Sequence, residues 1–505
     1  MDQLIFTPSS HVKIEINKTA IAKRDLIVIN KIDFAAKNLT SNAGIFLLFE
    51  NAKTNGIFEL IENDLVFDNE STNKIKMNHS KTMLCGHIVG IDKLERLKLL
   101  QGDPLINEFD ISVKEPETVS RFLGNFSYKT TQMFREINFK VFKKLLCKSK
   151  LTSITIDIDS SVINVEGHQE GTTRGYNPKK LGNLCYNIQF AFCDELKANI
   201  TGFVRSGNTY TANGAAEMIK EIVANIKTDD LEIMFRMDSG YFDEEIIETI
   251  ESLGCKYLIK AKGYPTLVSQ VTDPSILFVT GDKGREMAEL FTKLNTWGKD
   301  RKFVVSRILK PEKDRAQLSL FDGDEYEYFF YVTNTELPSE IVVISYEKRG
   351  NAENYIKEAK YDMAVGHLLL KSFWANEAVF QMMMLAYNLF LLFKFDSLCI
   401  SEYRQQIKTF RLKYVFLAGK IIRTARYVVM KLSAKYPYKD VYENCLSQEN
   451  SVEYFGVGFR VFYEVCLPYP IFCFTRIIHK IHDKVVQNML QFRKFPQNPS
   501  PVERK

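Results

Sequence analysis

Leu151-Thr-Ser-Ile-Thr-Ile-Asp-Ile-Asp-Ser160 predicts a β-strand with one apolar and one acidic face. Side chains point alternately to the two sides of a strand. The isoleucines therefore share one side, and Asp157 and Asp159 share the other. Two aspartates on one face of a strand predict a metal-binding edge, although an aspartate before two serines is also typical of a turn.

A second carboxylate ends another short apolar stretch, Leu231-Glu-Ile-Met-Phe-Arg-Met-Asp-Ser-Gly240. This stretch predicts a strand that ends at Asp238, followed by a helix from about Asp243 to Leu253. Aspartates at strand ends are well placed to bind ligands at the carboxyl edge of a sheet. An aspartate before Ser-Gly is also compatible with an ordinary turn.

A third group of polar residues lies in Tyr346-Glu-Lys-Arg-Gly-Asn-Ala-Glu-Asn-Tyr-Ile-Lys-Glu-Ala-Lys360, which is a good helix former. Four residues recur there at helical spacing: Tyr346, Arg349, Glu353 and Lys360. At about 100° per residue they fall within an arc of about 60° on one helix face. An acid between two cations suits a phosphate backbone beside a metal-binding carboxylate. The alternative is a solvated helix face with ordinary ion pairs.

The order of elements from Leu151 onward predicts an α/β fold with a ribonuclease H-like core. We predict strands at 151–159, about 184–193, about 198–206, 231–237 and 256–261, and helices near 212–226 and 243–253. This order is the one that such a core requires, and its final helix is expected to carry Glu353. Residues 262–337 separate that helix from the preceding strands of the core. They contain β-type segments at 275–280, 302–308 and 326–333. They predict a β-rich insertion within the core.

These residues resemble the catalytic core of DDE transposases of bacterial insertion sequences. Asp159, Asp238 and Glu353 match the family's three acids and lie 79 and 115 residues apart. The spacing from Tyr346 to Lys360 is similar to the Tyr-Arg-Glu-Lys pattern of the insertion-sequence-4-like superfamily. Further stretches resemble its insertion-sequence-1380-like branch: Ile156-Asp-Ile-Asp-Ser-Ser161, Gly175-Tyr-Asn-Pro-Lys179, Arg205-Ser-Gly-Asn208, Arg236-Met-Asp-Ser-Gly-Tyr-Phe242, Val332-Thr-Asn334, Phe373-Trp-Ala-Asn376 and Ala386-Tyr-Asn-Leu389.

Carboxylates without a Cys or His cluster favour Mg²⁺ or Mn²⁺ over zinc. The resemblance implies two such ions about 4 Å apart. Asp159 would bridge both ions, and Asp238 and Glu353 would each complete one side. Asp157 is a further possible metal residue, which would tune the site or contact an ion indirectly through one of its ligands.

Several residues are predicted to contact DNA. Arg349 and Lys360 suit phosphate contacts, and Tyr346 suits a hydrogen bond to a phosphate; each could instead pair with Glu353 or pack at the helix margin. Related hairpin-forming transposases stack a flipped base on an aromatic residue of the β-rich region. Trp297 is the corresponding candidate here, and a core tryptophan is the alternative.

The charge of the chain is unevenly distributed. The net charge is +5, but the part from Ser401 onward holds 18 Lys and Arg against 8 Asp and Glu, a net of +10, so the first 400 residues carry −5. Six basic residues of this part are predicted to contact a DNA backbone. They are Arg404, Lys408 and Arg411 on one helix face, then Lys420, Arg423 and Arg426. A solvated basic helix is the alternative.

The N-terminal part predicts strands at 12–16, 26–29 and 44–49 and helices at 90–100 and 117–123, the last preceded by Pro116. The helices resemble the family's N-terminal end-binding domain. Ser120 and Arg121 are then candidates for DNA contact. An exposed polar turn of a packing helix is the alternative.

Composition limits the class of protein. The 505 residues are too many for one core, and 45% hydrophobic residues are typical of a globular protein. The nine cysteines are scattered, which argues against a zinc site or a disulfide framework and suits a reducing cytoplasm. No signal peptide is expected. The apolar segment 378–393 is short for a membrane span and includes Gln381 and Asn388, so it predicts a buried core helix.

We therefore predict five regions: an N-terminal DNA-end-binding region at 1–148 (helical from about 86), the two parts of the ribonuclease H-like core at 149–263 and 340–396, the β-rich insertion at 264–339 and a basic, mainly helical region at 397–505. The resemblance implies a bacterial cytoplasmic cut-and-paste transposase that is associated with the nucleoid when bound to DNA. Its partners would be terminal inverted repeats and target DNA, bound as a homodimer, without a membrane. Alternatives are an inactive or domesticated DNA-binding derivative and a ribonuclease H-like nuclease without strand transfer.

Overall fold

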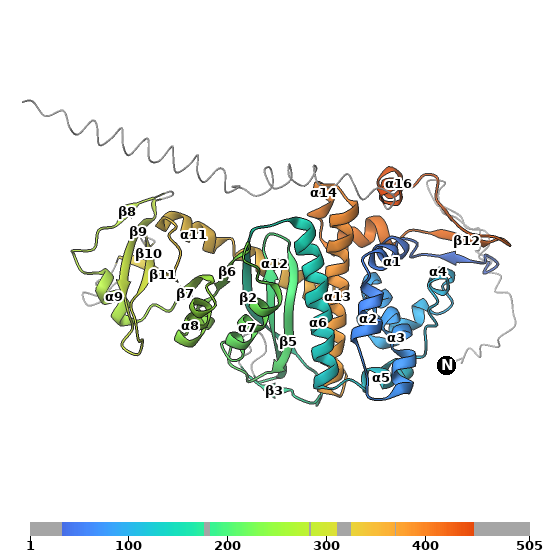
Figure 1. Ribbon diagram of the computed structural model, residues 1–505, viewed down its shortest axis with the longest axis horizontal. Helices are drawn as coiled ribbons and strands as arrows, with labels where there is room; N and C mark the ends of the chain where they lie inside the picture. The colour runs from blue at the N-terminus through green and yellow to red at the C-terminus, as the bar shows by residue number, and fades with distance from the viewer. Residues whose placement is uncertain (1–32, 176–181, 282–283, 311–324, 369, 449–505) are drawn as a thin grey trace, which may run out of the picture.

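A ten-stranded mixed sheet forms the centre of the protein (Figure 1). The structure is a computed structural model, and it describes residues 33–175, 182–281, 284–310, 325–368 and 370–448. The strand order is β3-β4-β2-β6-β7-β11-β10-β9-β8, and β5 pairs with β4. The first strands and the helices between them are β2 (Ser153–Asn164), β3 (Thr173–Arg174), β4 (Leu184–Cys193), β5 (Ala198–Ser206), α7 (Ala215–Ile226), β6 (Glu232–Met237), α8 (Glu244–Ser252) and β7 (Lys256–Ala261).

Strand β2 has a parallel neighbour on one side and an antiparallel neighbour on the other. β6 runs parallel to β2 and β7 parallel to β6, whereas β4 is antiparallel to β2 and β5 to β4. Ile154, Ile156 and Ile158 are buried, as their alternation predicts. Asp157, on the opposite face, is only 1% exposed. The acidic face of β2 is therefore covered at this point and does not form an open edge.

Helix α13 (Phe373–Ser397) lies between the sheet and the N-terminal helices (Figure 1). It is long and apolar enough to cross a membrane, but its most apolar segment is completely buried inside the protein. Gln381 Nε2 donates to Gly202 O (2.8 Å), and Asn388 Nδ2 donates to Asn199 O (2.8 Å). These two amides satisfy backbone carbonyls of β5. The predicted buried core helix over 378–393 is confirmed.

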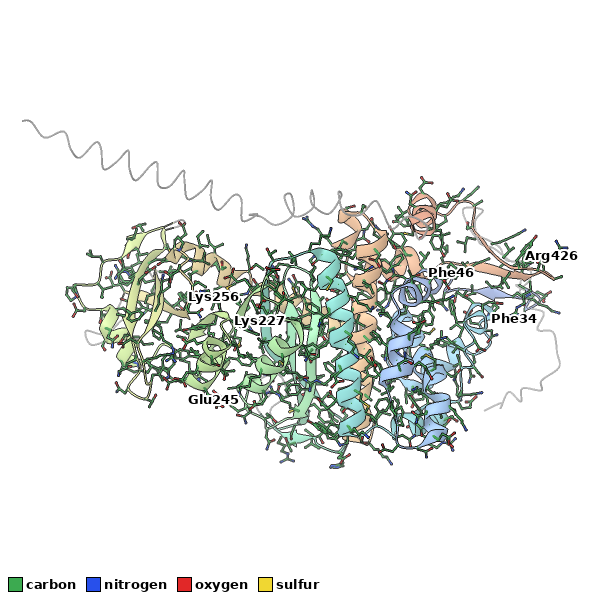
Figure 2. All side chains as sticks on the ribbon, in the orientation of Figure 1. Phe34, Phe46, Lys227, Glu245, Lys256 and Arg426 are labelled. Carbon is green, nitrogen blue, oxygen red and sulfur yellow. The ribbon has the colours of Figure 1, made fainter. Side chains whose placement is uncertain are left out.

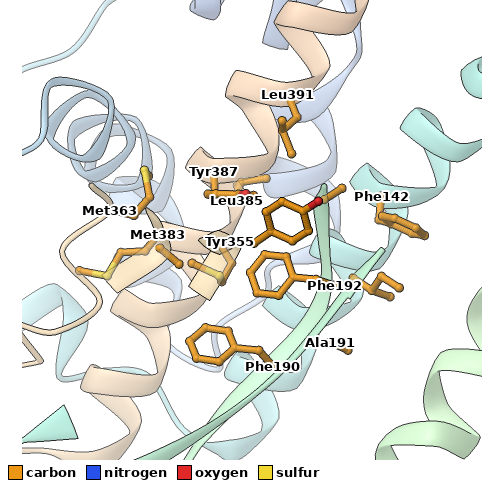
Figure 3. Packing of buried hydrophobic residues seen from close by; sticks show 14 of the residues in the cluster. Phe142, Phe190, Ala191, Phe192, Tyr355, Met363, Met383, Leu385, Tyr387 and Leu391 are labelled. Carbon is orange, nitrogen blue, oxygen red and sulfur yellow. The ribbon is translucent and has the colours of Figure 1, made fainter. Parts of the chain in front are cut away.

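Aromatic side chains fix helix α12 (Gly350–Tyr361) to the sheet (Figure 3). The ring of Phe192 on β4 lies 6.0 Å from Tyr355 of α12 and 5.8 Å from Tyr387 of α13, between ring centroids. Phe190 contacts Phe380 of α13 in the same way, at 5.6 Å. The position of α12 is therefore set by β4 and α13 together.

The predicted insertion extends the central sheet instead of forming a sheet of its own. Its elements are α9 (Pro265–Val271), β8 (Val279–Thr280), β9 (Glu286–Thr292), β10 (Arg301–Leu309) and β11 (Tyr326–Thr333). β11 pairs antiparallel with β7, and β10 and β9 follow outward. The strands predicted at 302–308 and 326–333 are present. The one predicted at 275–280 is reduced to β8.

The N-terminal region is helical much earlier than expected. Its elements are α1 (Ile45–Thr54), α2 (Ile57–Asp64), α3 (Glu70–Val89), the 3-10 helix η1 (Leu94–Leu100), α4 (Pro104–Glu108), α5 (Pro116–Leu123) and α6 (Tyr128–Ser149). The strand predicted at 44–49 is wrong, because these residues begin α1. Periodicity does not separate a short apolar strand from a buried helix. The strands predicted at 12–16 and 26–29 lie outside the described residues.

The C-terminal region contains a β-hairpin that the sequence did not predict. Its elements are α14 (Ile400–Tyr403), α15 (Ile407–Phe410), the π-helical turn η4 (Arg411–Val415), β12 (Gly419–Arg423), β13 (Val428–Leu432) and α16 (Lys439–Gln448). β12 pairs antiparallel with β13 and with β1 (Leu39–Thr40). The prediction of a mainly helical region is therefore wrong over 419–432. Residues 449–505 lie outside the described residues.

Candidate active site

Asp159 and Asp238 meet where two neighbouring parallel strands bring them together. Ile158 of β2 and Met237 of β6 are register partners, and each aspartate is the next residue along its strand. Asp159 Oδ1 accepts a hydrogen bond from Ser160 N (2.8 Å), and Asp238 Oδ1 accepts one from Gly240 N (2.8 Å). The other carboxylate oxygen of each residue remains for a shared partner.

That partner is Arg349. Its Nη2 atom lies 2.8 Å from Asp159 Oδ2 and 3.5 Å from Asp238 Oδ2, so one guanidinium nitrogen contacts both acids. Arg349 Nε is buried without a hydrogen-bond partner in the described structure. Burial lowers the pKa of Arg349, but Asp159 and Asp238 raise it above its ordinary value. The guanidinium is therefore charged.

Burial raises the pKa of Asp159 to about 6. The neighbouring charge of Arg349 opposes this rise, whereas the negative charges of Asp238 and Glu353 add to it. Crowding of carboxylates is costly unless a cation compensates for it. The site is therefore built to hold positive charge between its acids.

Glu353 approaches from a helix that is interrupted just before it. Tyr346 lies in the last turn of the helix α11 (Ser339–Glu347), whereas Glu353 and Lys360 belong to α12. Arg349 is the N-cap residue of α12. The prediction that these four residues share one continuous helix face is therefore wrong. Glu353 is 55% exposed, and its nearest cation is Lys357 at 3.9 Å.

Two of the three predicted ligands fit a divalent cation. The Oδ2 atoms of Asp159 and Asp238 already converge on one positively charged nitrogen, and hard oxygen donors are what Mg²⁺ and Mn²⁺ prefer. Among the described residues, no group of three or more His, Cys, Asp or Glu side chains is arranged to hold a metal ion. The role of Glu353 as a third ligand stays a prediction.

Most of the chain matches one protein-family profile. The profile described as "Transposase DDE domain group 1" matches residues 28–452. The chain belongs to this transposase family. Among solved structures it is similar to a chain of "Cryo-EM structure of piggyBac transposase synaptic complex with hairpin DNA (SNHP)", with 12% sequence identity and a TM-score of 0.40 over 73% of this chain and 79% of that one. No curated protein matches.

Asp157 does not take part in the transposase's acidic pair. Arg236 Nε donates to Asp157 Oδ1 (2.6 Å), and Arg236 Nη2 donates to Asp157 Oδ2 (2.7 Å). Both carboxylate oxygens are therefore occupied in a buried ion pair. This ion pair argues against Asp157 as a direct metal ligand, and its role in tuning the site stays a prediction. Sequence reasoning missed Arg236, although its position two residues before Asp238 repeats that of Asp157 before Asp159.

Two of the predicted DNA contacts lie beside the pair of acids. Lys360 Nζ donates to Ser161 Oγ (2.9 Å) and to Val162 O (3.0 Å), which ties α12 to β2. Tyr346 is half-buried, and its ring lies 4.9 Å from that of Tyr331. Burial raises the pKa of Tyr346 well above its ordinary value. The hydroxyl therefore remains protonated and able to donate to a phosphate.

The structure contradicts two other predicted contacts. Trp297 is only 7% exposed and packs among Phe242, Phe303 and Arg301, so the core alternative replaces base stacking. Arg411 is also buried. Its guanidinium donates to three backbone carbonyls, those of His87 (2.6 Å), Ile88 (2.6 Å) and Asp362 (2.5 Å). Arg411 therefore joins α3 to the end of α12 and is not a DNA contact.

The remaining basic candidates lie on the surface of the transposase. Arg121, Arg404, Lys408, Lys420, Arg423 and Arg426 are exposed. Arg121 Nη2 donates to Thr118 Oγ1 (3.1 Å), and Arg423 pairs with Glu108 at 2.9 Å. Arg426 lies in the turn between β12 and β13, at the outer end of the molecule (Figure 2). Arg404 follows α14 and Lys408 belongs to α15, so the helix face predicted for Arg404, Lys408 and Arg411 is not formed.

Proposed function

We propose that this protein is a cut-and-paste transposase that binds terminal inverted repeats, cleaves the ends of its element and joins the 3′ ends to target DNA. The observation that carries the proposal is the contact of one Arg349 nitrogen with both Asp159 and Asp238. The strand order β5-β4-β2-β6-β7, in which only β4 runs opposite to the others, supports a ribonuclease H-like core. The motif from Tyr346 to Lys360 supports the insertion-sequence-4-like superfamily, and stretches such as Arg236-Met-Asp-Ser-Gly-Tyr-Phe242 support its insertion-sequence-1380-like branch.

In this proposal the residues of the chain hold and orient the reacting groups. Asp159 and Asp238 would hold the divalent ions, and Glu353 would complete the ligand set. Two bound ions would supply an activated water or 3′-hydroxyl and would stabilise the leaving oxygen of an in-line displacement. Arg349, which lies against both aspartates, would orient the scissile phosphate. The Tyr346 hydroxyl donates to a neighbouring phosphate.

A cleavage and joining assay tests the proposal. The full chain is mixed with DNA that carries the inverted repeats flanking its coding region, with and without Mg²⁺, and end cleavage is followed separately from strand transfer. We expect Mg²⁺-dependent cleavage and recovery of joined products from a dimeric complex. Cleavage without joined products would favour the nuclease alternative. Specific binding without cleavage would favour the DNA-binding derivative.

The hairpin β12–β13 gives a prediction about DNA binding. We expect Arg426→Ala to weaken binding about equally for all DNA sequences and to reduce the slope of log affinity against log salt by about 1, because one phosphate contact is lost. Fluorescence anisotropy over a range of salt concentrations measures both effects. The matched control is Lys293→Ala, an exposed lysine just after β9, which lies at the opposite end of the molecule from the hairpin (Figure 1). An unchanged slope for Arg426→Ala would remove the hairpin from the DNA-binding surface.

A further inference from the structure

A buried arginine two residues before Asp238 makes more contacts than its ion pair with Asp157. Arg236 is 1% exposed. Besides its two bonds to Asp157, Nη2 donates to Asp194 Oδ2 (2.9 Å) and Nη1 donates to Ser345 O (2.6 Å). Burial lowers the pKa of Arg236, but the carboxylates of Asp157 and Asp194 raise it well above its ordinary value. The guanidinium is therefore permanently charged, and all three of its nitrogens donate.

The partners of Arg236 lie next to the site residues along the chain. Asp157 precedes Asp159 by two residues on β2, and Ser345 lies in the last turn of α11, four residues before Arg349. Asp194 lies in the turn between β4 and β5.

The same network also reaches the helix that carries Glu353. Asp194 Oδ1 accepts a hydrogen bond from the hydroxyl of Tyr355 (3.1 Å), two residues after Glu353 on α12. One buried group thus connects every element that supplies a residue to the site.

We propose that Arg236 is a positioning residue that sets the separation of Asp159, Asp238 and the α11–α12 junction. A buried ion pair is weak evidence for stability, because an apolar pair of similar volume often serves as well. A planar guanidinium with fixed donors does set distances and angles between its partners. Phosphoryl transfer depends on such distances, since a displacement of about 1 Å costs about 100-fold in rate. This inference rests on the proposed function for its catalytic consequence but not for its geometry.

The test compares Arg236→Lys with Arg301→Lys. Arg301 is a matched control because it is 3% exposed and pairs with Glu244 and Glu251 in a similar buried network, far along the sheet on β10. Hydrogen exchange is measured without metal in the segments 157–161, 236–241 and 345–355. We expect Arg236→Lys to increase exchange in all three segments and to lower the turnover number for cleavage about 100-fold, with DNA affinity unchanged within about twofold. Arg301→Lys should change neither the exchange nor the turnover.

Each outcome decides one of two questions. Unchanged exchange in the three segments of Arg236→Lys, or an equal change in Arg301→Lys, overturns the positioning role whether or not the protein cleaves DNA. Absence of cleavage by the wild-type protein, with the expected exchange pattern, overturns the proposed function and leaves the positioning role in place. If Arg236→Lys does not fold, the apolar pair Asp157→Leu/Arg236→Met replaces it, and the same exchange pattern is expected in a stable protein.

Discussion

Replacing Asp159 by alanine is expected to reduce DNA cleavage by at least about 1,000-fold. A metal-bound site lowers the barrier by several kcal/mol, and each 1.36 kcal/mol is a factor of ten in rate. Asp159 supplies one of the two oxygen atoms that converge on the cationic position, and Asp238 alone does not replace it. The rate of end cleavage under single-turnover conditions measures the effect.

DNA binding should survive the same substitution. Asp159 is acidic and lies on strand β2, so its removal takes no positive charge from the surface. The affinity for end DNA should stay within about threefold of the wild-type value, since Arg349 keeps its contact with Asp238. Asp229→Ala, an exposed aspartate just before β6, is the control and should cleave normally. More than a tenth of the wild-type rate in Asp159→Ala would remove Asp159 from the catalytic set.

The meeting of Asp159 and Asp238 could be predicted because it depends on local rules. Alternation along 151–160 fixes which residues share a face, and an acid at the end of β6 lies beside the neighbouring residue of the parallel strand β2. The same rules placed α8 and the strands β4 to β7. The same spacing could have identified Arg236, which precedes Asp238 by two residues, as Asp157 precedes Asp159.

The errors arise where partners distant in sequence decide the structure. The helix over 346–360 reads as continuous because nothing before Gly350 disfavours helix, yet the chain turns at Lys348 and Arg349 and brings Arg349 across the two acids. Arg411 has the spacing of a surface cation, but carbonyls at the end of α3 and after α12 surround it. Tertiary packing decides whether Arg411 is buried, and the spacing of charged residues along the sequence does not predict that packing.

Gly44 marks another contact that connects distant parts of the chain. Ala43 N donates to Leu417 O (2.9 Å) and Gly44 N to Val415 O (3.2 Å), so the start of α1 lies against the residues that follow η4. A Cβ atom built on Gly44 would lie 1.6 Å from Tyr414 O and 2.7 Å from Val415 Cα. Its φ of −73° is ordinary, so the glycine is required by the close approach of two backbones and not by its own conformation.

Gly44→Ala is therefore expected to lower the free energy of unfolding by about 3 kcal/mol or more, the upper part of the range for overpacked sites, because backbone atoms cannot move aside as a side chain can. Thermal unfolding followed by circular dichroism measures the loss, and exchange of amides in α1 and in 415–421 should rise together. Gly298→Ala is the matched control, since its added Cβ would meet only Glu244 Oε1, at 3.9 Å. We expect its melting temperature to match the wild-type value. Equal melting temperatures for both variants would mean that α1 does not approach η4 this closely in solution.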